Sequence, residues 1–362
     1  MKYYSPSKIN KKGATYNLII GERSNGKTYA ILLQALKDYC QHKNHFGYVR
    51  RWKEDITGRR AQRLFAGINE NGEVERLTKG AFKGVHYFAG KFYLCNYDES
   101  GKVVYGDADI IGFTFALSDS EHDKSTSFPN IKTVIFDEFL TNKVYLNDEF
   151  VFFMNVVSTI VRRRDDVKIY MLGNTVNKFC PYFKEMGLDH VQKMQQGTID
   201  VYKYGDSKLT VAVEYCASNT ENGEQGANHY FAFNNPKLEM ITGGAWELNM
   251  YPHLPYKYKP KDILLIYFIE FNDNIYQAEI IDVEGAVFTY IHDKTTPIRK
   301  PEQSIIYSLD YKPEPNYNRN IYRPNSKMQE KILWFIRNDK VFYQDNEVGD
   351  SINNFLKICK RG

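Results

Sequence analysis

The sequence predicts an α/β protein with two folded domains, in which a nucleotide-binding domain with a mostly parallel sheet precedes a linker and a smaller α+β domain. The length supports two domains, because 362 residues exceed the roughly 150 residues of a typical one. Strand-like and helix-like stretches alternate through the first half, which is typical of a parallel sheet covered by helices. A run of strand-like stretches follows in the last third. We place the domains at 1–195 and 257–362, with the linker at 196–256.

In the first half, short apolar runs alternate with amphipathic stretches. The apolar runs predict strands at 15–20, 46–49, 110–117, 133–136 and 167–172. Two aromatic stretches around Ala89-Gly90-Lys91 predict a hairpin over 85–96. Helices are expected at 28–40, where apolar residues recur on one face, and at 148–164, where acids occupy the first turn. Helices that connect successive strands predict a parallel sheet.

The second half begins with a change in amino-acid composition. Asn, Gly and Ser gather around 218–223 and prolines close the segment, which predicts a linker with some local structure. Beyond it, stretches at 263–270, 275–281 and 286–292 predict a three-stranded meander. Helices are expected at 326–338 and 348–360. This pattern indicates a second, α+β domain.

The composition is that of a folded protein. A hydrophobic share of 43% and a charged share of 25% exclude disordered, collagen-like and coiled-coil classes. The longest apolar stretches, 150–161 and 263–269, are shorter than the ~20 residues that a membrane-spanning helix needs. No apolar signal segment opens the sequence, so we expect a cytoplasmic protein. Five scattered cysteines without a CxxC pair predict neither disulfides nor a zinc site, and a net charge of +4 does not by itself indicate a nucleic-acid partner.

A phosphate-binding motif stands between the first expected strand and the first long helix. The motif GxxxxGK[ST] is matched by Gly21, Glu22, Arg23, Ser24, Asn25, Gly26, Lys27 and Thr28. Its glycines allow backbone N–H groups to turn toward phosphates at a helix N-terminus. The Lys27 ammonium would reach the outer phosphates, and the Thr28 hydroxyl would bind Mg²⁺. A glycine-rich turn without a ligand is the alternative, and the strand–helix context favours the nucleotide site.

Two adjacent acids end the apolar strand at 133–136. Asp137 would hold Mg²⁺ through water, and Glu138 would orient and deprotonate an attacking water. A solvated turn is the alternative for an isolated pair of acids. The second acid favours nucleotide hydrolysis over phosphoryl transfer to a metabolite. The sequences at 142–145 and 177–180 lack the aspartate of a guanine-reading NKxD motif, so ATP is the expected nucleotide.

Further polar residues follow the helix and strand ends of the same domain. Arg162 either complements the negative end of its helix or, in a ring ATPase, enters the active site of a neighbouring subunit. Asn174 either polarises the γ-phosphate or the water, or serves a turn. Arg50 and Lys53 follow the second strand beside the expected nucleotide pocket, in a basic stretch that a solvated surface also explains.

Two kinds of feature are compatible with nucleic-acid binding. Lys124 and Lys143 lie on polar loops that could contact DNA, although exposed loop lysines are common. Between residues 294 and 331, eight Lys/Arg residues face four acids and are interleaved with tyrosines. That combination suits backbone neutralisation and base stacking, and an ordinary surface would look similar.

The order of these motifs resembles that of the genome-packaging ATPases of phi29-type tailed phages. The resemblance rests on the phosphate loop and on 48–53, 120–124, 128–130, 134–139 (VIFDEF), 160–164 and 172–174. It covers residues 15–185 and is weak beyond residue 200, where it rests mainly on the meander. The resemblance implies an ASCE-type ATPase that uses ATP and Mg²⁺ to pump double-stranded DNA into an empty viral prohead.

The same resemblance implies partners and residue roles. Members of the family form homo-oligomeric rings, pentamers, at the portal of the prohead, and some dock on a structural packaging RNA. The arginine that matches Arg162 is a finger supplied in trans, and the family's acidic pair matches Asp137 and Glu138. The segment matching 50–53 adjoins the nucleotide and the subunit interface. The expected location is the cytoplasm of the infected host cell, transiently on the prohead.

For residues 257–362 the resemblance implies a ribonuclease H-like fold that has lost its metal site and binds nucleic acid. Glu270, Asp282 and Asp293 end the three expected strands, so a residual carboxylate cluster stays open. The GxDxG-like first strand of active nucleases is absent, which favours a domain that does not cut DNA. Two alternatives remain open: a large terminase with an active nuclease, and a P-loop NTPase or kinase that does not act on nucleic acid.

Overall fold

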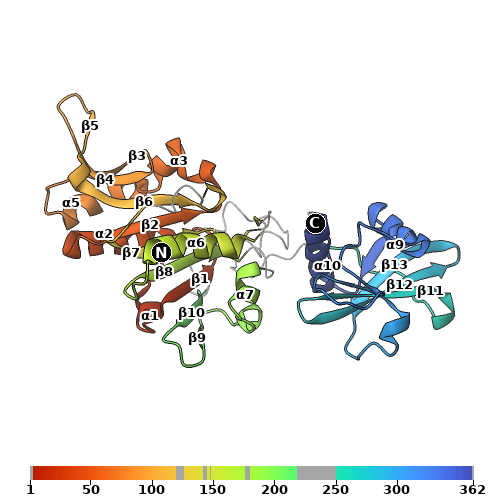
Figure 1. Ribbon diagram of the computed structural model, residues 1–362. Helices are drawn as coiled ribbons and strands as arrows, with labels where there is room; N and C mark the ends of the chain where they lie inside the picture. Colours follow the sequence, from red (N-terminus) through yellow and green to blue (C-terminus); the bar gives the residue numbers. More distant parts are fainter. Residues whose placement is uncertain are drawn as a thin grey trace. The chain divides into compact units, whose positions relative to one another are not determined.

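The computed structural model divides the chain into two units, Met1–Glu247 and Leu248–Gly362 (Figure 1). It describes residues 3–119, 126–141, 145–146, 148–175, 180–217 and 250–360. Every helix in these ranges is too short or too polar to span a membrane.

A large sheet forms the centre of the first unit (Figure 1). Its parallel strands, in spatial order, are β6 (Ile110–Ala116), β2 (His45–Arg50), β7 (Ile131–Asp137), β8 (Lys168–Asn174), β1 (Tyr16–Gly21) and β10 (Thr210–Tyr215). Antiparallel strands extend both edges: β4 (Lys91–Tyr97) and β3 (Gly84–Phe88) beyond β6, and β9 (Ile199–Lys203) beyond β10; β5 (Val103–Val104) pairs with β4. The mostly parallel sheet and the hairpin agree with the fold predicted from the sequence.

An apolar layer packs on each face of the sheet. The central strands are therefore buried on both faces. In β1, Leu18 and Ile20 pack in one hydrophobic cluster with α6 (Glu149–Val161), whereas Ile19 packs in another with α2 (Lys27–His42). Successive residues of a strand point to opposite faces, so α6 and α2 lie on opposite sides of the sheet. Shorter helices complete the unit: α1 (Ser7–Asn10), α3 (Gly58–Arg63), α4 (Ala66–Glu70), α5 (Glu73–Leu77) and α7 (Pro181–Glu185).

The register of the parallel strands brings three strand ends to one edge. Gly21 at the end of β1 pairs with Asn174 at the end of β8, and Asp137 at the end of β7 pairs with Leu172 of β8. Ligands of open parallel sheets bind outside the carboxyl ends of the strands. This carboxyl edge is therefore where the predicted site residues can meet.

The second unit contains a separate six-stranded sheet and two helices. Its antiparallel meander is β11 (Ile263–Phe271), β12 (Asn274–Val283) and β13 (Ala286–Asp293). Parallel neighbours follow: β14 (Ile305–Ser308) beside β11, β15 (Tyr317–Asn318) beside β14, and β16 (Val341–Tyr343) beside β13. The helices are α9 (Lys327–Arg337) and α10 (Asn346–Cys359). The antiparallel meander and the two helices agree with the α+β domain predicted from the sequence.

The structure differs from the sequence prediction at the start of the linker. Residues 199–203 and 210–215 form β9 and β10, and β10 is a buried neighbour of β1. The first domain therefore extends beyond residue 195, because its sheet includes β10, whose partner β1 lies far away in the sequence. Most of the Asn- and Gly-rich segment, at 218–249, lies outside the described residues. The sequence pattern also predicted none of the short strands β14 to β16.

Candidate nucleotide site

The phosphate loop joins β1 to α2 through left-handed backbone conformations. Ser24 has a φ of 59° and Gly26 a φ of 87°, and α2 begins at Lys27 directly after this turn. The first backbone N–H groups of a helix have no intrahelical acceptor, and the helix dipole favours an anion beside them. The loop and the start of α2 can therefore bind phosphate oxygens.

Lys27 is buried, and neutral oxygens hold its ammonium. Its Nζ donates to the Asn174 Oδ1 at 2.7 Å and to the Glu22 carbonyl at 2.8 Å, and the side chain is 5% exposed. Burial lowers the pKa of Lys27 from its usual value. Burying an ammonium costs free energy unless an opposite charge lies close by. The carboxylates of Asp137, Glu22 and Glu138 act on the ammonium but do not offset its burial. A triphosphate would add further negative charge, so the residues present fit this ligand.

The Thr28 hydroxyl and the Asp137 carboxylate lie together at the carboxyl edge. Thr28 Oγ1 donates to both carboxylate oxygens of Asp137 at 3.2 Å, and the Glu138 N–H donates to Asp137 Oδ1 at 3.1 Å. A hydroxyl and a carboxylate are hard oxygen ligands of the kind that Mg²⁺ prefers. The donor set therefore fits a magnesium ion bound with the nucleotide.

Glu138 lies beside Asp137 in a strained conformation. Its φ is 58°, which is uncommon for a residue with a Cβ and is found mostly where surrounding structure enforces it. Its Oε2 is 2.6 Å from the Arg50 guanidinium, which also contacts Asp55 at 3.4 Å. The structure thus brings Arg50 to the acidic pair, through Glu138.

A cavity of about 240 Å³ unites these parts. It is lined by Ser24, Asn25, Gly26, Lys27, Thr28, Tyr29, Asp137, Glu138, Leu172, Gly173 and Asn174. The residues predicted on three separate motifs therefore share one cavity. Gly21 and Glu22 contribute backbone oxygens beneath Lys27, and Arg23 is exposed on the loop.

The other predicted site residues lie elsewhere or cannot be placed. Lys53 pairs with Asp119 at 2.6 Å and does not line the cavity. Lys124 and Lys143, the candidates for DNA contacts, lie outside the described residues.

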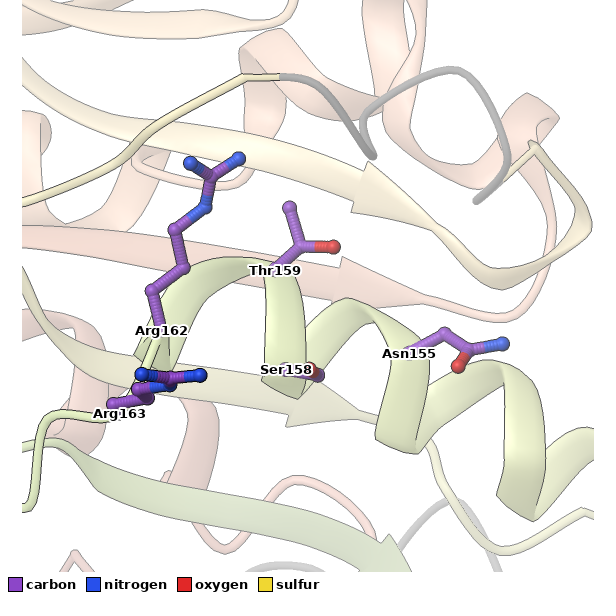
Figure 2. Close-up of a pocket in the computed structure, with 5 residues that line it drawn as sticks. All are labelled: Asn155, Ser158, Thr159, Arg162 and Arg163. Carbon is purple, nitrogen blue, oxygen red and sulfur yellow. The ribbon is translucent and has the colours of Figure 1, made fainter.

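Arg162 ends α6 at the opposite edge of the sheet. Because α6 connects the end of β7 to the start of parallel β8, its last residue lies near the amino ends of these strands. Arg162 and Arg163 line a second hollow of about 540 Å³ together with Asn155, Ser158 and Thr159 of the same helix (Figure 2). Arg162 also donates to the Thr126 carbonyl at 2.7 Å.

Arg164 differs from its two neighbours. Its guanidinium donates to the carbonyls of Phe128, Pro129, Ile131 and Ile160 at 2.6 to 3.2 Å. These bonds join the end of α6 to the start of β7, so Arg164 has a structural role.

Sequence reasoning missed two side chains that support the carboxyl edge. Tyr48 of β2 donates to Asp137 Oδ2 at 2.9 Å. Arg51 forms a bidentate pair with buried Glu149 at 2.7 and 2.9 Å and donates to the Phe139 carbonyl at 2.8 Å. Tyr182 donates to the same glutamate at 2.9 Å. The basic run that contains Arg51 was predicted to lie beside the nucleotide pocket, with a solvated surface as the alternative, and no local signal marks the distant partner of Arg51.

In the second unit, the three candidate carboxylates do not form a cluster. Glu270 pairs with Lys312 at 2.6 Å, and Asp282 accepts a hydrogen bond from Gly285 in the turn at the other end of β12. Asp293 pairs in register with Tyr276, whereas Glu270 pairs with the preceding residue, so these two acids point to opposite faces. Over the described part of the chain, no group of three or more His, Cys, Asp or Glu is arranged to hold a metal.

The tyrosines of the basic stretch are not equally available for base stacking. Tyr307 is only 1% exposed and belongs to the core, whereas Tyr311 is 80% exposed. A stacking surface in this stretch can therefore include Tyr311, and Tyr307 is excluded from it.

Comparison with known proteins identifies relatives of about half of the chain and similar folds for nearly all of it. The DNA packaging proteins of Bacillus phages PZA and phi29 are each 28% identical over 185 residues, which is 50% of this chain and 49% of theirs. The chain thus matches about half the length of these curated relatives. The bacteriophage phi29 genome packaging motor assembly has a TM-score of 0.57 at 19% identity, covering 99% of this chain and 98% of that one.

A second solved structure, the Phi-28 gp11 DNA packaging motor, has a TM-score of 0.53 at 19% identity and covers 99% of this chain and 96% of that one. At this identity the likeness concerns the fold. The model of the podovirus DNA encapsidation protein (Gp16) family matches residues 1–203, more than half of the chain. The chain therefore belongs to the podovirus DNA encapsidation protein (Gp16) family.

Proposed function

We propose that this protein is the ATP-hydrolysing subunit of a motor that packages double-stranded DNA into a viral prohead. The observation that carries the proposal is the cavity in which Lys27, Thr28, Asp137, Glu138 and Asn174 converge. Family membership supports the choice of DNA as the substrate that is moved, because the curated relatives are DNA packaging proteins.

In the proposed mechanism, the phosphate loop and Lys27 bind the triphosphate of ATP through backbone N–H groups and the buried ammonium. Thr28 and Asp137 would hold Mg²⁺, which when bound would neutralise negative charge on the phosphates. Asn174 fixes the Lys27 ammonium through the 2.7 Å hydrogen bond and can also face the γ-phosphate from the end of β8.

Glu138 is the proposed general base, which takes a proton from the attacking water. Its side chain is 57% exposed, so solvent water reaches it, but its carboxylate is paired with Arg50. The ion pair must open, or share Glu138 with the water, before proton transfer. Hydrolysis therefore depends on the position of Arg50 as well as on the phosphate loop.

Arg162 is proposed to act in the site of a neighbouring copy. An α6 of 13 residues spans about 20 Å, at 1.5 Å per residue, between the carboxyl edge and Arg162. The side chain cannot complete the site of its own subunit over that span. A homo-oligomeric ring, a pentamer by resemblance to the family, would bring each Arg162 to the next subunit's phosphates, where an arginine stabilises transition-state charge.

The proposed partners follow from this motor role. They are double-stranded DNA, the portal of the prohead and, as in some relatives, a packaging RNA. The protein would act in the cytoplasm of the infected host cell and transiently on the prohead.

The test measures the ATPase rate of the full chain alone, with DNA, and with DNA and proheads. We expect hydrolysis that DNA and proheads stimulate and that Lys27→Ala abolishes. A rate that neither addition changes would favour a P-loop NTPase or kinase unrelated to nucleic acid.

The second unit is proposed to bind nucleic acid without cutting it. The pairing of Glu270 with Lys312 supports this, because a metal ion would have to displace the lysine ammonium from that carboxylate. Incubation of the full chain with plasmid and Mn²⁺ is expected to leave the DNA intact, and binding should weaken as salt rises. Nicking that Glu270→Ala removes would support an active nuclease instead.

A further inference from the structure

The Asp137 carboxylate receives hydrogen bonds from three sides. Thr28 and the Glu138 N–H belong to the nucleotide-binding elements, with donor distances of 3.2 and 3.1 Å. The third donor is the Tyr48 hydroxyl, 2.9 Å from Oδ2, which comes from the neighbouring strand β2. Tyr48 pairs in register with Ile135, two residues before Asp137, so its ring extends along the same face toward the carboxylate.

Tyr48 is built into the interior. It is 3% exposed, and its ring lies edge-on to Phe92 with the centroids 6.5 Å apart. The hydroxyl is the donor of the bond to Asp137, because a carboxylate oxygen can only accept.

We propose that Tyr48 is a positioning residue that fixes the orientation of Asp137 toward the metal at Thr28. The inference rests on the proposed function, since it assumes a metal–nucleotide complex in the cavity. The terminal torsion of an aspartate is broad, so hydrogen bonds decide how its carboxylate is turned. Carboxylates that bind metals are commonly held by such outer donors, and removal of one typically weakens metal affinity by 10- to 100-fold.

A purely structural role makes a different prediction. Phenylalanine preserves the ring that packs against Phe92 and removes only the hydroxyl. If Tyr48 served packing alone, Tyr48→Phe would leave metal binding unchanged. The hydroxyl bond to Asp137 is therefore the feature to be tested.

The experiment titrates Mn²⁺ into the full chain with a non-hydrolysable ATP analogue and follows free Mn²⁺ by electron paramagnetic resonance. Tyr48→Phe is expected to weaken Mn²⁺ binding by about 10- to 100-fold. Binding of the analogue without metal, in EDTA, should stay within about twofold, because Tyr48 lies against Asp137 and outside the phosphate loop. In hydrolysis, KM for Mg²⁺ should rise while kcat recovers at saturating Mg²⁺.

Tyr87→Phe is the matched control. Tyr87 is also buried in the same hydrophobic cluster, and its hydroxyl donates to the Ile56 carbonyl at 2.6 Å, away from Asp137. The Tyr87→Phe variant should bind Mn²⁺ with the same affinity as the unchanged protein. The inference is overturned if Tyr48→Phe binds Mn²⁺ normally, or if Tyr87→Phe weakens binding equally. Failure of the unchanged protein to bind the Mn²⁺–analogue complex would instead overturn the proposed function.

Discussion

The two edges of the first unit's sheet carry different kinds of polar group. At the carboxyl edge the proposed catalytic side chains contact one another: Lys27 with Asn174, and Thr28 with Asp137. At the amino edge, Arg162 ends α6 beside an open hollow and donates to a backbone carbonyl (Figure 2). The carboxyl edge thus gathers groups that can hold a nucleotide within one chain, whereas Arg162 of the same chain lies too far away to contact that nucleotide. This difference underlies the proposal that the complete site needs two copies.

The largest expected effect is at the carboxyl edge, where Glu138→Gln separates binding from chemistry. Glutamine keeps the shape of the side chain but cannot accept a proton, so hydrolysis should fall by about 10²- to 10⁴-fold. ATP binding, measured by equilibrium titration, should persist. Lys27→Ala is the contrasting variant, because it removes the phosphate-binding cation and should lose binding. A normal rate for Glu138→Gln would contradict its role as the base.

The next largest effect is a loss of stability when an ion pair is removed, and it should differ between the two edges of the sheet. Arg51→Ala would leave Glu149, which is 2% exposed, buried without its cation, at a cost of about 3–5 kcal/mol. Lys132→Ala removes an exposed partner of Asp166 near the amino edge and should cost about 1 kcal/mol or less. Thermal unfolding of both variants measures the difference. Equal losses would show that the Arg51 pair does not hold the carboxyl edge together.

The smallest effect is a pH dependence in the second unit, where no nucleotide site is proposed. A hydrogen bond from His292 to buried Glu279 raises the pKa of His292 above its usual value. A raised pKa in the folded state adds stability that is fully present below the unfolded value of about 6.5 and is lost as pH rises through the folded value. Unfolding between pH 5 and 8 should follow this trend, and His292→Gln should flatten it. If the pH dependence of stability persists in His292→Gln, another titratable group causes it.

The sequence predicted those parts of the fold and site that are encoded locally. The phosphate loop and the acids 137–138 each lie within one short motif, and apolar runs predicted β1, β2, β6, β7 and β8. Tyr48 and Arg51 were missed because their partners Asp137 and Glu149 lie 89 and 98 residues away. The strand β10 was missed for the same reason, since its pairing with β1 joins opposite ends of the domain. Contacts between residues far apart in the sequence are therefore the part of the fold and the site that the sequence did not predict.

The most direct test of the two-copy account mixes Arg162→Ala subunits with Lys27→Ala subunits. The first variant keeps its phosphate loop and loses the arginine, and the second keeps the arginine and loses the loop lysine. Each alone should be inactive, because an arginine supplied in trans contributes about 10³-fold or more to the rate. Mixed rings should regain hydrolysis, since some interfaces then pair an intact loop with an intact arginine. No recovery in rings shown to contain both variants would contradict the account and leave Arg162 as a cation at the end of α6.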